Sequence, residues 1–261
     1  MGDIHNENDI EKNNEKNIEK KSKVLLLLGA SSDVGIKYIE EYGKKYDKIF
    51  AHYNCSSLEL NNLISDGFDI IEPVRADLLD DEDIDRLIST IKGSEYTPTN
   101  IVFLPARSTT LKKIEEVDID SLISDFKMQV IASSKLISAF ISPMKEAKYG
   151  RICFMLSSVT YQPVTYNYSY MISKYALWGE MRAMAKEFAP FGITVNAISP
   201  TMIDTKFVKD TSPFVKKKMI DMSPLKRLAT TDEIIPAIDF FMSEDSSYIT
   251  GDNLLISGGA S

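Results

Sequence analysis

Hydrophobic residues along this chain gather in short β-rich runs that alternate with longer segments of helical period. Such alternation predicts a parallel sheet covered by helices on both faces. The candidate strands are Val24–Leu28, Lys48–Tyr53, Asp69–Pro73, Asn100–Leu104, Arg151–Leu156, Thr194–Ile198 and Asn253–Ile256. We therefore expect an α/β fold with a doubly wound, Rossmann-type sheet of seven parallel strands.

The segments between the candidate strands predict helices. Three of them follow a residue that can cap a first helical turn, namely Asp80, Asp118 and Thr230. The candidate helices are Val34–Lys45, Leu58–Ser65, Asp81–Ile91, Ile119–Ala147, Tyr168–Ala189 and Thr231–Ser243. The sequence contains no internal repeat or linker, so we expect residues 23–261 to form one domain.

Composition changes this picture at the N-terminus. The first 22 residues are rich in Asn, Glu and Lys and have no apolar core, which is typical of a segment that does not pack. We expect residues 1–22 to be a mobile polar extension. The chain as a whole has 261 residues, 44% of them hydrophobic, which is enough for one large core.

Charge and rare residue types disfavour several classes of function. A formal net charge of −8 disfavours binding to nucleic acid or an anionic membrane, because both need a surplus of Lys and Arg. The longest aliphatic run, Val24–Leu28, is far shorter than the ~20 residues that span a membrane. The histidines, His5 and His52, are too few for a Ser-His-Asp triad or a histidine metal site, and we expect no metal. The cysteines, Cys55 and Cys153, suit a reducing cytoplasm.

A turn rich in small residues, from Gly29 to Gly35, joins the first candidate strand to a helix. Small residues let the backbone approach a pyrophosphate, whose charge is stabilised by the N–H groups and dipole of the helix N-terminus. Ligands of doubly wound sheets bind at the carboxyl ends of the strands. The turn is therefore a candidate nucleotide site, and the alternative is an ordinary strand-to-helix turn.

Tyr170 and Lys174 form a candidate proton-transfer pair. They are four residues apart, so a helix places both side chains on one face. A nearby ammonium stabilises a phenolate, which makes tyrosine a better proton-transfer group. Ser157 and Ser158 follow a candidate strand and should reach the same edge of the sheet. The alternative for this aromatic stretch is an ordinary packed helix.

Taken in order, these residues resemble the short-chain dehydrogenase/reductase family. The glycine turn of that family reads Thr-Gly-x-x-x-Gly-x-Gly; Gly29 and Gly35 match, Leu28 replaces the threonine and Asp33 replaces the middle glycine. Further matches cover nearly the whole chain after the extension: Gly150-Arg151-Ile152, Gly192–Pro200, Arg227-Leu228, Glu233, Ile249-Thr250-Gly251 and Gly258-Gly259.

The resemblance implies a role for each catalytic residue. Ser158, or Ser157 as the less favoured alternative, would hydrogen-bond the substrate carbonyl while Tyr170 transfers the proton and Lys174 orients the nicotinamide ribose. Gln129 aligns with a family asparagine that helps hold a relay water. The implied cofactor-binding residues are Gly29, Ser31, Ser32, Asp33, Val34, Gly35, Asn54, Ser56, Asp77, Leu78, Ala106, Tyr170, Lys174, Pro200, Ile203 and Thr205.

The segment after the second candidate strand bears on the choice of cofactor. Residues 52–57 contain no carboxylate that would bind the adenosine ribose and repel a 2′-phosphate. NADP(H) is therefore favoured over NAD(H).

The resemblance weakens around the expected nicotinamide pocket. Arg107 and Thr201 stand where the family has glycine, and Gln129 stands where it has asparagine. One hypothesis is a working reductase with an unusual substrate, in which Arg107 binds an anionic group or simply faces solvent. The other is a nucleotide-binding regulatory or scaffold protein with little or no catalysis. The retained serine, tyrosine and lysine favour the reductase.

Within the family, the chain is most similar to 3-oxoacyl-(acyl carrier protein) reductases and to reductases of sugars or polyols. An enoyl reductase would have its tyrosine at the position of Asn167. Lys206, Lys209 and the lysines at 216–218 suit an acidic carrier protein or a phosphorylated substrate, or form a solvated face. The two longest helices resemble those through which family members form dimers and tetramers, so we expect a homo-oligomer, most simply a homotetramer.

Overall fold

The computed structural model describes residues 22–107 and 111–260. Apart from Ser22, the predicted N-terminal extension lies outside the described residues. Seven strands form one parallel sheet in the order β3-β2-β1-β4-β5-β6-β7. They are β1 (Val24–Leu28), β2 (Lys48–Tyr53), β3 (Ile71–Arg75), β4 (Asn100–Phe103), β5 (Gly150–Met155), β6 (Ile193–Pro200) and β7 (Asn253–Ile256). The predicted single-domain, doubly wound α/β fold is confirmed.

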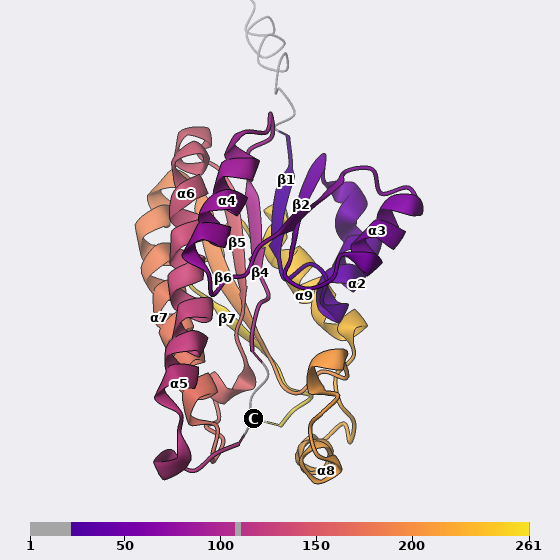
Figure 1. The fold of residues 1–261 in the computed structure, drawn as a ribbon, viewed down its shortest axis with the longest axis vertical. Coiled ribbons are helices and arrows are strands. Elements are labelled where there is room, and N and C mark those ends of the chain that lie inside the picture. Colours follow the sequence, from indigo (N-terminus) through magenta and orange to yellow (C-terminus); the bar gives the residue numbers. More distant parts are fainter. Residues whose placement is uncertain (1–21, 108–110, 261) are drawn as a thin grey trace, which may run out of the picture.

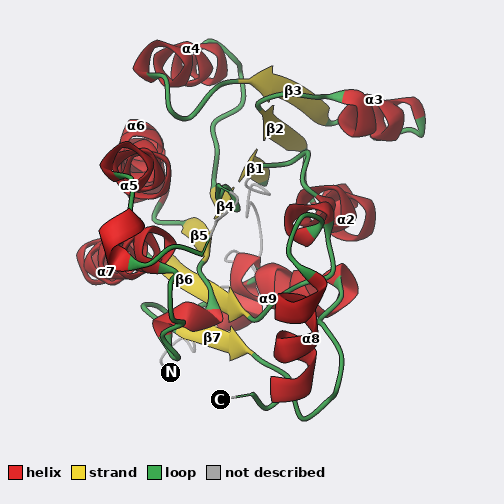
Figure 2. Ribbon diagram, turned by 60° about the horizontal axis from the view of Figure 1, so that its bottom comes forward, coloured by secondary structure: helices red, strands yellow, loops and turns green. Residues whose placement is uncertain are grey.

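Helices cover both faces of the sheet, as Figure 2 shows, with α4 to α7 on one face and α2, α3 and α9 on the other. Their bounds are α2 (Asp33–Tyr42), α3 (Leu58–Ser65), α4 (Asp81–Lys92), α5 (Ile119–Phe126), α6 (Ala132–Ala147), α7 (Tyr168–Phe188), α8 (Pro213–Met222) and α9 (Thr231–Met242). The predicted caps are confirmed: Asp80 and Asp118 accept hydrogen bonds from the first turns of α4 and α5, and Thr230 forms a capping box.

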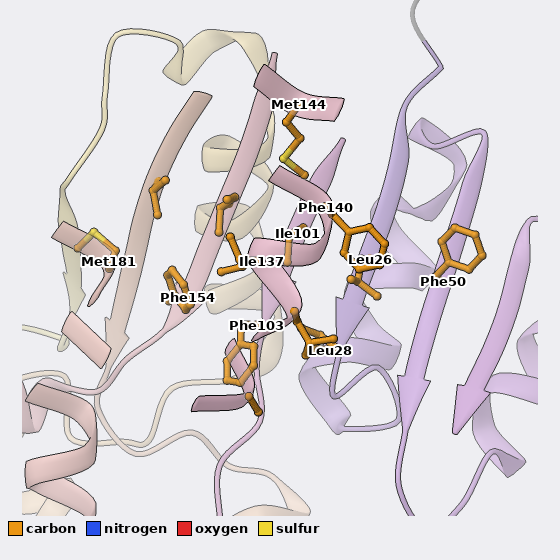
Figure 3. Close-up of a cluster of buried hydrophobic side chains, with 14 of the residues drawn as sticks. Leu26, Leu28, Phe50, Ile101, Phe103, Ile137, Phe140, Met144, Phe154 and Met181 are labelled. Atoms are coloured by element: carbon orange, nitrogen blue, oxygen red, sulfur yellow. The ribbon is translucent and has the colours of Figure 1, made fainter. Parts of the chain in front are cut away.

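Alternate side chains of β1 pack on opposite faces of the sheet. Successive strand side chains point to opposite sides, so Leu26 and Leu28 pack beneath α4, α6 and α7, in the cluster drawn in Figure 3. Leu25 and Leu27 pack instead beneath α2, α3 and α9, in a cluster that also holds the buried thiol of Cys153. A strand covered on both faces is apolar at every position.

The expected helix Ile119–Ala147 is in fact interrupted. α5 ends at Phe126, and the five residues Lys127–Ile131 form a π-helix before α6 begins. Next to this wider turn, the Ser133 hydroxyl lies 2.7 Å from the Gln129 carbonyl, 3.0 Å from the Val130 carbonyl and 2.7 Å from Glu180 Oε2, so three acceptors compete for its single proton. The interruption matters because Gln129 lies inside it.

Further elements differ from the sequence-based expectation. The helix expected over Val34–Lys45 ends at Tyr42, and Gly43–Lys45 form a 3₁₀-helix. The third strand lies two residues later than expected and contains Pro73, which is tolerated because β3 is an edge strand. The helix α8 was not predicted; Ser212 caps it and Pro213 occupies its first position. In Figure 1, α8 lies near the C-terminus at the end of the molecule where the strands finish.

The strand order fixes where a ligand can bind. The chain leaves β1 for β2 on one side of it, and β4 pairs with β1 on the other side. The connections after β1 and β4 therefore diverge and leave a crevice at the carboxyl ends of these strands. The glycine turn follows β1, so it lies at this switch point.

Candidate active site

Four polar side chains meet beyond the carboxyl end of β5. α7 supplies Tyr170 in its first turn and Lys174 one turn later, the π-helix supplies Gln129, and the segment after β5 supplies Ser157. Lys174 is fully buried. Its Nζ donates to Gln129 Oε1 at 3.0 Å and to the Met155 carbonyl at 2.7 Å, and it lies 5.6 Å from the centre of the Tyr170 ring.

The Gln129 side chain is held at both ends. Its Nε2 donates to the carbonyl of Pro105 at 2.8 Å, in the segment that follows β4. Because only the oxygen of an amide can accept from an ammonium, the amide orientation is determined by these two partners. Gln129 thus links the carboxyl end of β4 to Lys174, at the position for which we expected a relay residue.

The structure distinguishes the two candidate serines. The Ser157 side chain lies close enough to the Tyr170 hydroxyl to lower the pKa of that hydroxyl. Ser158 lies instead in a hollow lined by the segment after β5, α8 and the end of β7, and Tyr170 is not part of that lining. β5 ends at Met155 and a 3₁₀-helix starts at Ser158, so the chain bends between the two serines. The geometry therefore favours Ser157, the alternative that the sequence ranked second, as the partner of Tyr170.

The protonation of the pair follows from its surroundings. Burial lowers the pKa of the Lys174 ammonium to about 7, although the nearby Asp125 carboxylate opposes this shift. Tyr170 is half-buried, and loss of hydration raises the pKa of its hydroxyl; the neighbouring Ser157 side chain lowers that pKa and Asp125 raises it. Near neutral pH, Tyr170 is therefore a phenol that can donate a proton.

Arg107 pairs with a carboxylate of its own chain. Its Nη1 lies 3.3 Å from Asp125 Oδ1 and donates to the Ser121 carbonyl at 3.2 Å, both on α5. Burial raises the pKa of Asp125, and the guanidinium works against that shift. This pairing differs from both sequence-based alternatives, an anchor for a substrate anion and a residue facing only solvent.

The glycine turn has the shape of a phosphate cradle. Gly29 has φ +77°, in the left-handed region that favours glycine, and a Cβ at Gly35 would lie 2.5 Å from the Ala30 carbonyl oxygen. His52 supports the turn, because its Nδ1 accepts the Gly29 N–H at 3.0 Å while its Nε2 donates to the Ala76 carbonyl at 3.0 Å. These bonds define a neutral imidazole, and burial lowers the pKa of His52 to about 4.

The start of α2 completes the cradle. Ser32 caps the helix through its hydroxyl, which accepts the Gly35 N–H at 3.1 Å. The first N–H groups of a helix have no partner inside it, so those of Asp33 and Val34 suit a phosphate. The Asp33 side chain does not suit a phosphate, because its carboxylate is negatively charged. This carboxylate accepts a hydrogen bond from the backbone of Lys206. Ser31 is half-buried in the same turn. The backbone here fits a dinucleotide.

The expected adenosine contacts lie at the ends of β2 and β3. Asn54 and Ser56 follow β2, with the exposed Cys55 between them. The Asp77 carboxylate accepts the Leu79 N–H at 2.9 Å, so it also closes a local turn. The Leu78 side chain is buried in the core, which leaves its backbone for a ligand.

The expected nicotinamide contacts follow β4 and β6. Ala106 is half-buried next to the residue whose carbonyl holds Gln129. Pro200 ends β6. Ile203 is bridged to Ala229 and packs on the core, while Thr205 begins the segment toward α8. The sequence-predicted cofactor residues outside α7 thus lie in segments at the carboxyl ends of β1 to β4 and β6, on one edge of the sheet.

No cluster of three or more His, Cys, Asp or Glu side chains suited to a metal ion occurs in residues 22–107 and 111–260. Within the same ranges, no helix is long and apolar enough to cross a membrane.

Comparison with known proteins identifies the family of the chain. A family model described as Enoyl-(Acyl carrier protein) reductase matches residues 50–261. The uncharacterized oxidoreductase YmfI of Bacillus subtilis is 30% identical over 243 residues, which cover 91% of this chain and 98% of that protein. The 3-oxoacyl-(acyl-carrier-protein) reductase FabG of Buchnera aphidicola is 31% identical over 243 residues, with 93% and 89% covered.

Solved structures agree on the fold. The structure of YwfH, an NADPH dependent reductase involved in bacilysin biosynthesis, superposes with a TM-score of 0.83 at 18% identity and covers 92% of this chain and 98% of its own. The family match spans most of the chain and includes both Tyr170 and Lys174. The chain therefore belongs to the short-chain dehydrogenase/reductase family, whose oxidoreductases act on CH–OH and C=O groups with a nicotinamide cofactor.

Proposed function

We propose that this protein is an NADP(H)-dependent reductase that converts a ketone to a secondary alcohol, with Ser157, Tyr170 and Lys174 as its catalytic residues. The observation that carries the proposal is the cluster itself, in which Lys174 Nζ lies 5.6 Å from the centre of the Tyr170 ring and the Ser157 side chain neighbours the Tyr170 hydroxyl. Gln129 positions Lys174.

Each residue has a distinct part in this mechanism. Nicotinamide supplies the hydride when it is bound. Ser157 and Tyr170 donate hydrogen bonds to the substrate carbonyl oxygen, and Tyr170 gives its proton to that oxygen as negative charge develops there. The positive charge of Lys174 stabilises the phenolate that remains. Two hydrogen bonds fix the position of its Nζ, and the third N–H can hydrogen-bond the nicotinamide ribose.

Two features support NADP(H). The segment Asn54–Ser57 carries no carboxylate, and Glu59, the first acid after it, pairs with Lys206. Arg75 supplies a cation at the same place: it is more than half exposed, and its Nε donates to the Asn54 carbonyl at 3.3 Å. Its guanidinium also pairs with Asp83, so it would be shared with a 2′-phosphate.

The hollow beside Ser158 suits the substrate. Methionines and other apolar side chains form much of its lining, which includes Met202, Met219, Met222, Val164 and Leu255. Methionine adapts to irregular apolar groups, which fits the alkyl part of a 3-oxoacyl thioester. The lysines of the α8 region carry the charge that an acidic carrier protein or a phosphorylated keto sugar would meet.

We further propose a homo-oligomer, a dimer or a tetramer, in the cytoplasm. Large apolar side chains are exposed along α5, the π-helix and the neighbouring α7: Ile119, Ile123, Phe126, Ile131, Tyr168 and Tyr175. Exposed apolar side chains gathered on adjacent helices are typical of a protein–protein interface. Both cysteines are free, which suits a reducing compartment.

NADPH consumption with a β-ketoacyl thioester and with a panel of keto sugars tests the function. Wild-type protein should oxidise NADPH only when a suitable carbonyl compound is present, and Tyr170→Phe should lose at least about 10²-fold in kcat. The result that would overturn the mechanism is equal turnover by the Phe variant. NADPH binding without reduction of any carbonyl compound would identify the nucleotide-binding scaffold instead.

A further inference from the structure

Asp33 places a carboxylate at the point where the glycine turn becomes a helix. It is the first residue of α2, directly after the cap Ser32, and its side chain is 23% exposed. The positive end of the helix dipole favours an anion at this position. In this chain the anion is already present as a side chain, at the turn position where the family pattern has glycine.

The carboxylate is bonded to a segment far away in the sequence. Its Oδ2 accepts the backbone N–H of Lys206 at 2.5 Å, and its Oδ1 lies 3.5 Å from Lys206 Nζ. Lys206 begins the 3₁₀-helix that follows Thr205 and leads toward α8, whose Met219 and Met222 line the apolar hollow; we call residues 206–222 the cover. The hydrogen bond to Asp33 therefore connects this cover to the glycine turn when no ligand is bound.

The charges around this bond do not cancel. Lys206 Nζ also pairs with Glu59 of α3, and both carboxylates raise the pKa of the lysine. One cation faces two anions, Asp33 and Glu59, so the group carries a net charge of −1. A diphosphate that enters the glycine turn meets this negative charge, although the backbone around it is shaped for phosphate.

From this geometry we infer two roles for Asp33 in the nucleotide site on which the proposed function rests. It lowers the affinity for the cofactor, and it fixes the position of the cover. Its charge repels the cofactor diphosphate and holds the affinity for dinucleotides below that which glycine would give. Its hydrogen bond holds the backbone at Lys206 in place in the cofactor-free protein.

Two substitutions separate these effects. Asp33→Asn removes the charge and keeps an oxygen that accepts the Lys206 N–H, whereas Asp33→Gly removes both. We expect each variant to bind NADPH and NADH on the order of threefold to tenfold more tightly than wild type, by the loss of a nearby like charge. Titration of nicotinamide fluorescence measures this, and the gain should shrink at high salt because screening weakens the repulsion. Glu59→Gln, which also brings the net charge of this group to zero but acts from outside the turn, should tighten binding less than Asp33→Asn does.

Hydrogen exchange of the Lys206 amide, measured in cofactor-free protein, tests the tie, that is, the hydrogen bond from this amide to Asp33. Exchange should be at least tenfold faster in Asp33→Gly than in wild type and close to wild type in Asp33→Asn. Unchanged or weaker cofactor binding by both variants would overturn the role in affinity, and unchanged exchange in Asp33→Gly would overturn the tie. If wild type and variants bind no nicotinamide nucleotide, the proposed function and the role in affinity both fail, while the exchange measurement still decides the tie.

Discussion

Lys174 and Gln129 are joined by a hydrogen bond of 3.0 Å between Nζ and Oε1, in a part of the protein that is closed to water. The ammonium has a second acceptor in the Met155 carbonyl. An ammonium has three donors, so one remains for a ligand. Substitution of Gln129 can therefore change the protonation of Lys174 without removing the lysine.

Substitution of Gln129 should shift the pH dependence of catalysis. Gln129→Glu sets a carboxylate against Lys174 and raises its pKa from about 7, whereas Gln129→Leu removes an acceptor and lowers it. If the ammonium form is the active one, kcat/KM falls above this pKa, and that limb should move to higher pH in the Glu variant and to lower pH in the Leu variant. Identical profiles in all three proteins would contradict the role of Gln129.

The two adjacent serines provide a matched pair of variants. Ser157→Ala should reduce kcat on the order of 10²-fold, because it removes a hydrogen-bond donor at the reacting oxygen. Ser158→Ala should leave kcat within about threefold and alter mainly KM, because Ser158 lines the apolar hollow. Steady-state kinetics of both variants decide between them, and the reverse result would restore the preference for Ser158.

The pair of Arg107 and Asp125 should be coupled in stability. Asp125 is buried, while about a third of the Arg107 side chain is exposed, so solvent screening keeps the expected effect modest. Arg107→Met should lower the free energy of unfolding by about 1 kcal/mol, because it leaves a buried carboxylate without its cation. A double-mutant cycle with Asp125→Asn, measured by urea denaturation, should show that the two effects are not additive. Additive effects would mean that the contact contributes nothing.

His52 should make the protein less stable as the pH falls. Its folded-state pKa of about 4 lies below the usual value near 6.5, so the unfolded chain takes up a proton first. The contribution is fully present above pH 6.5 and is lost as the pH falls toward 4; between pH 7 and pH 5 the loss is about 2 kcal/mol. Urea denaturation at the two pH values measures it. His52→Asn should be less stable at pH 7 but lose less on acidification, and an equal loss would refute the assignment.

Much of the fold is predictable because it depends on burial along the sequence. β1, β2 and β7 have the predicted bounds, since apolar runs ended by glycine or polar residues define them. The break at Lys127–Ile131 is different, because the helical period continues on both sides of it. It coincides with partners from the segment after β4 and from α7 that hold Gln129, and these contacts are distant in the sequence. Such contacts leave no local pattern.

The site shows the same division. The proximity of Tyr170 and Lys174 was predictable because their spacing already places them on one helix face. The choice between Ser157 and Ser158 was not predictable in the same way, because the resemblance aligns both serines with the family pattern and no local spacing separates them. The chain leaves the strand at Met155, so the alternation of β5 does not extend to the serines. The bond of Asp33 to Lys206 joins residues 173 positions apart and has no sequence signal at all.

The two cysteines lie in different environments, so only one of them is accessible to thiol reagents. Burial raises the pKa of the Cys153 thiol, which keeps it protonated and out of reach of reagents, whereas Cys55 is exposed between Asn54 and Ser56. A maleimide dye should therefore label the native chain at one position. That position adjoins the expected adenosine ribose, so the attached dye would report nucleotide binding directly, without an engineered cysteine.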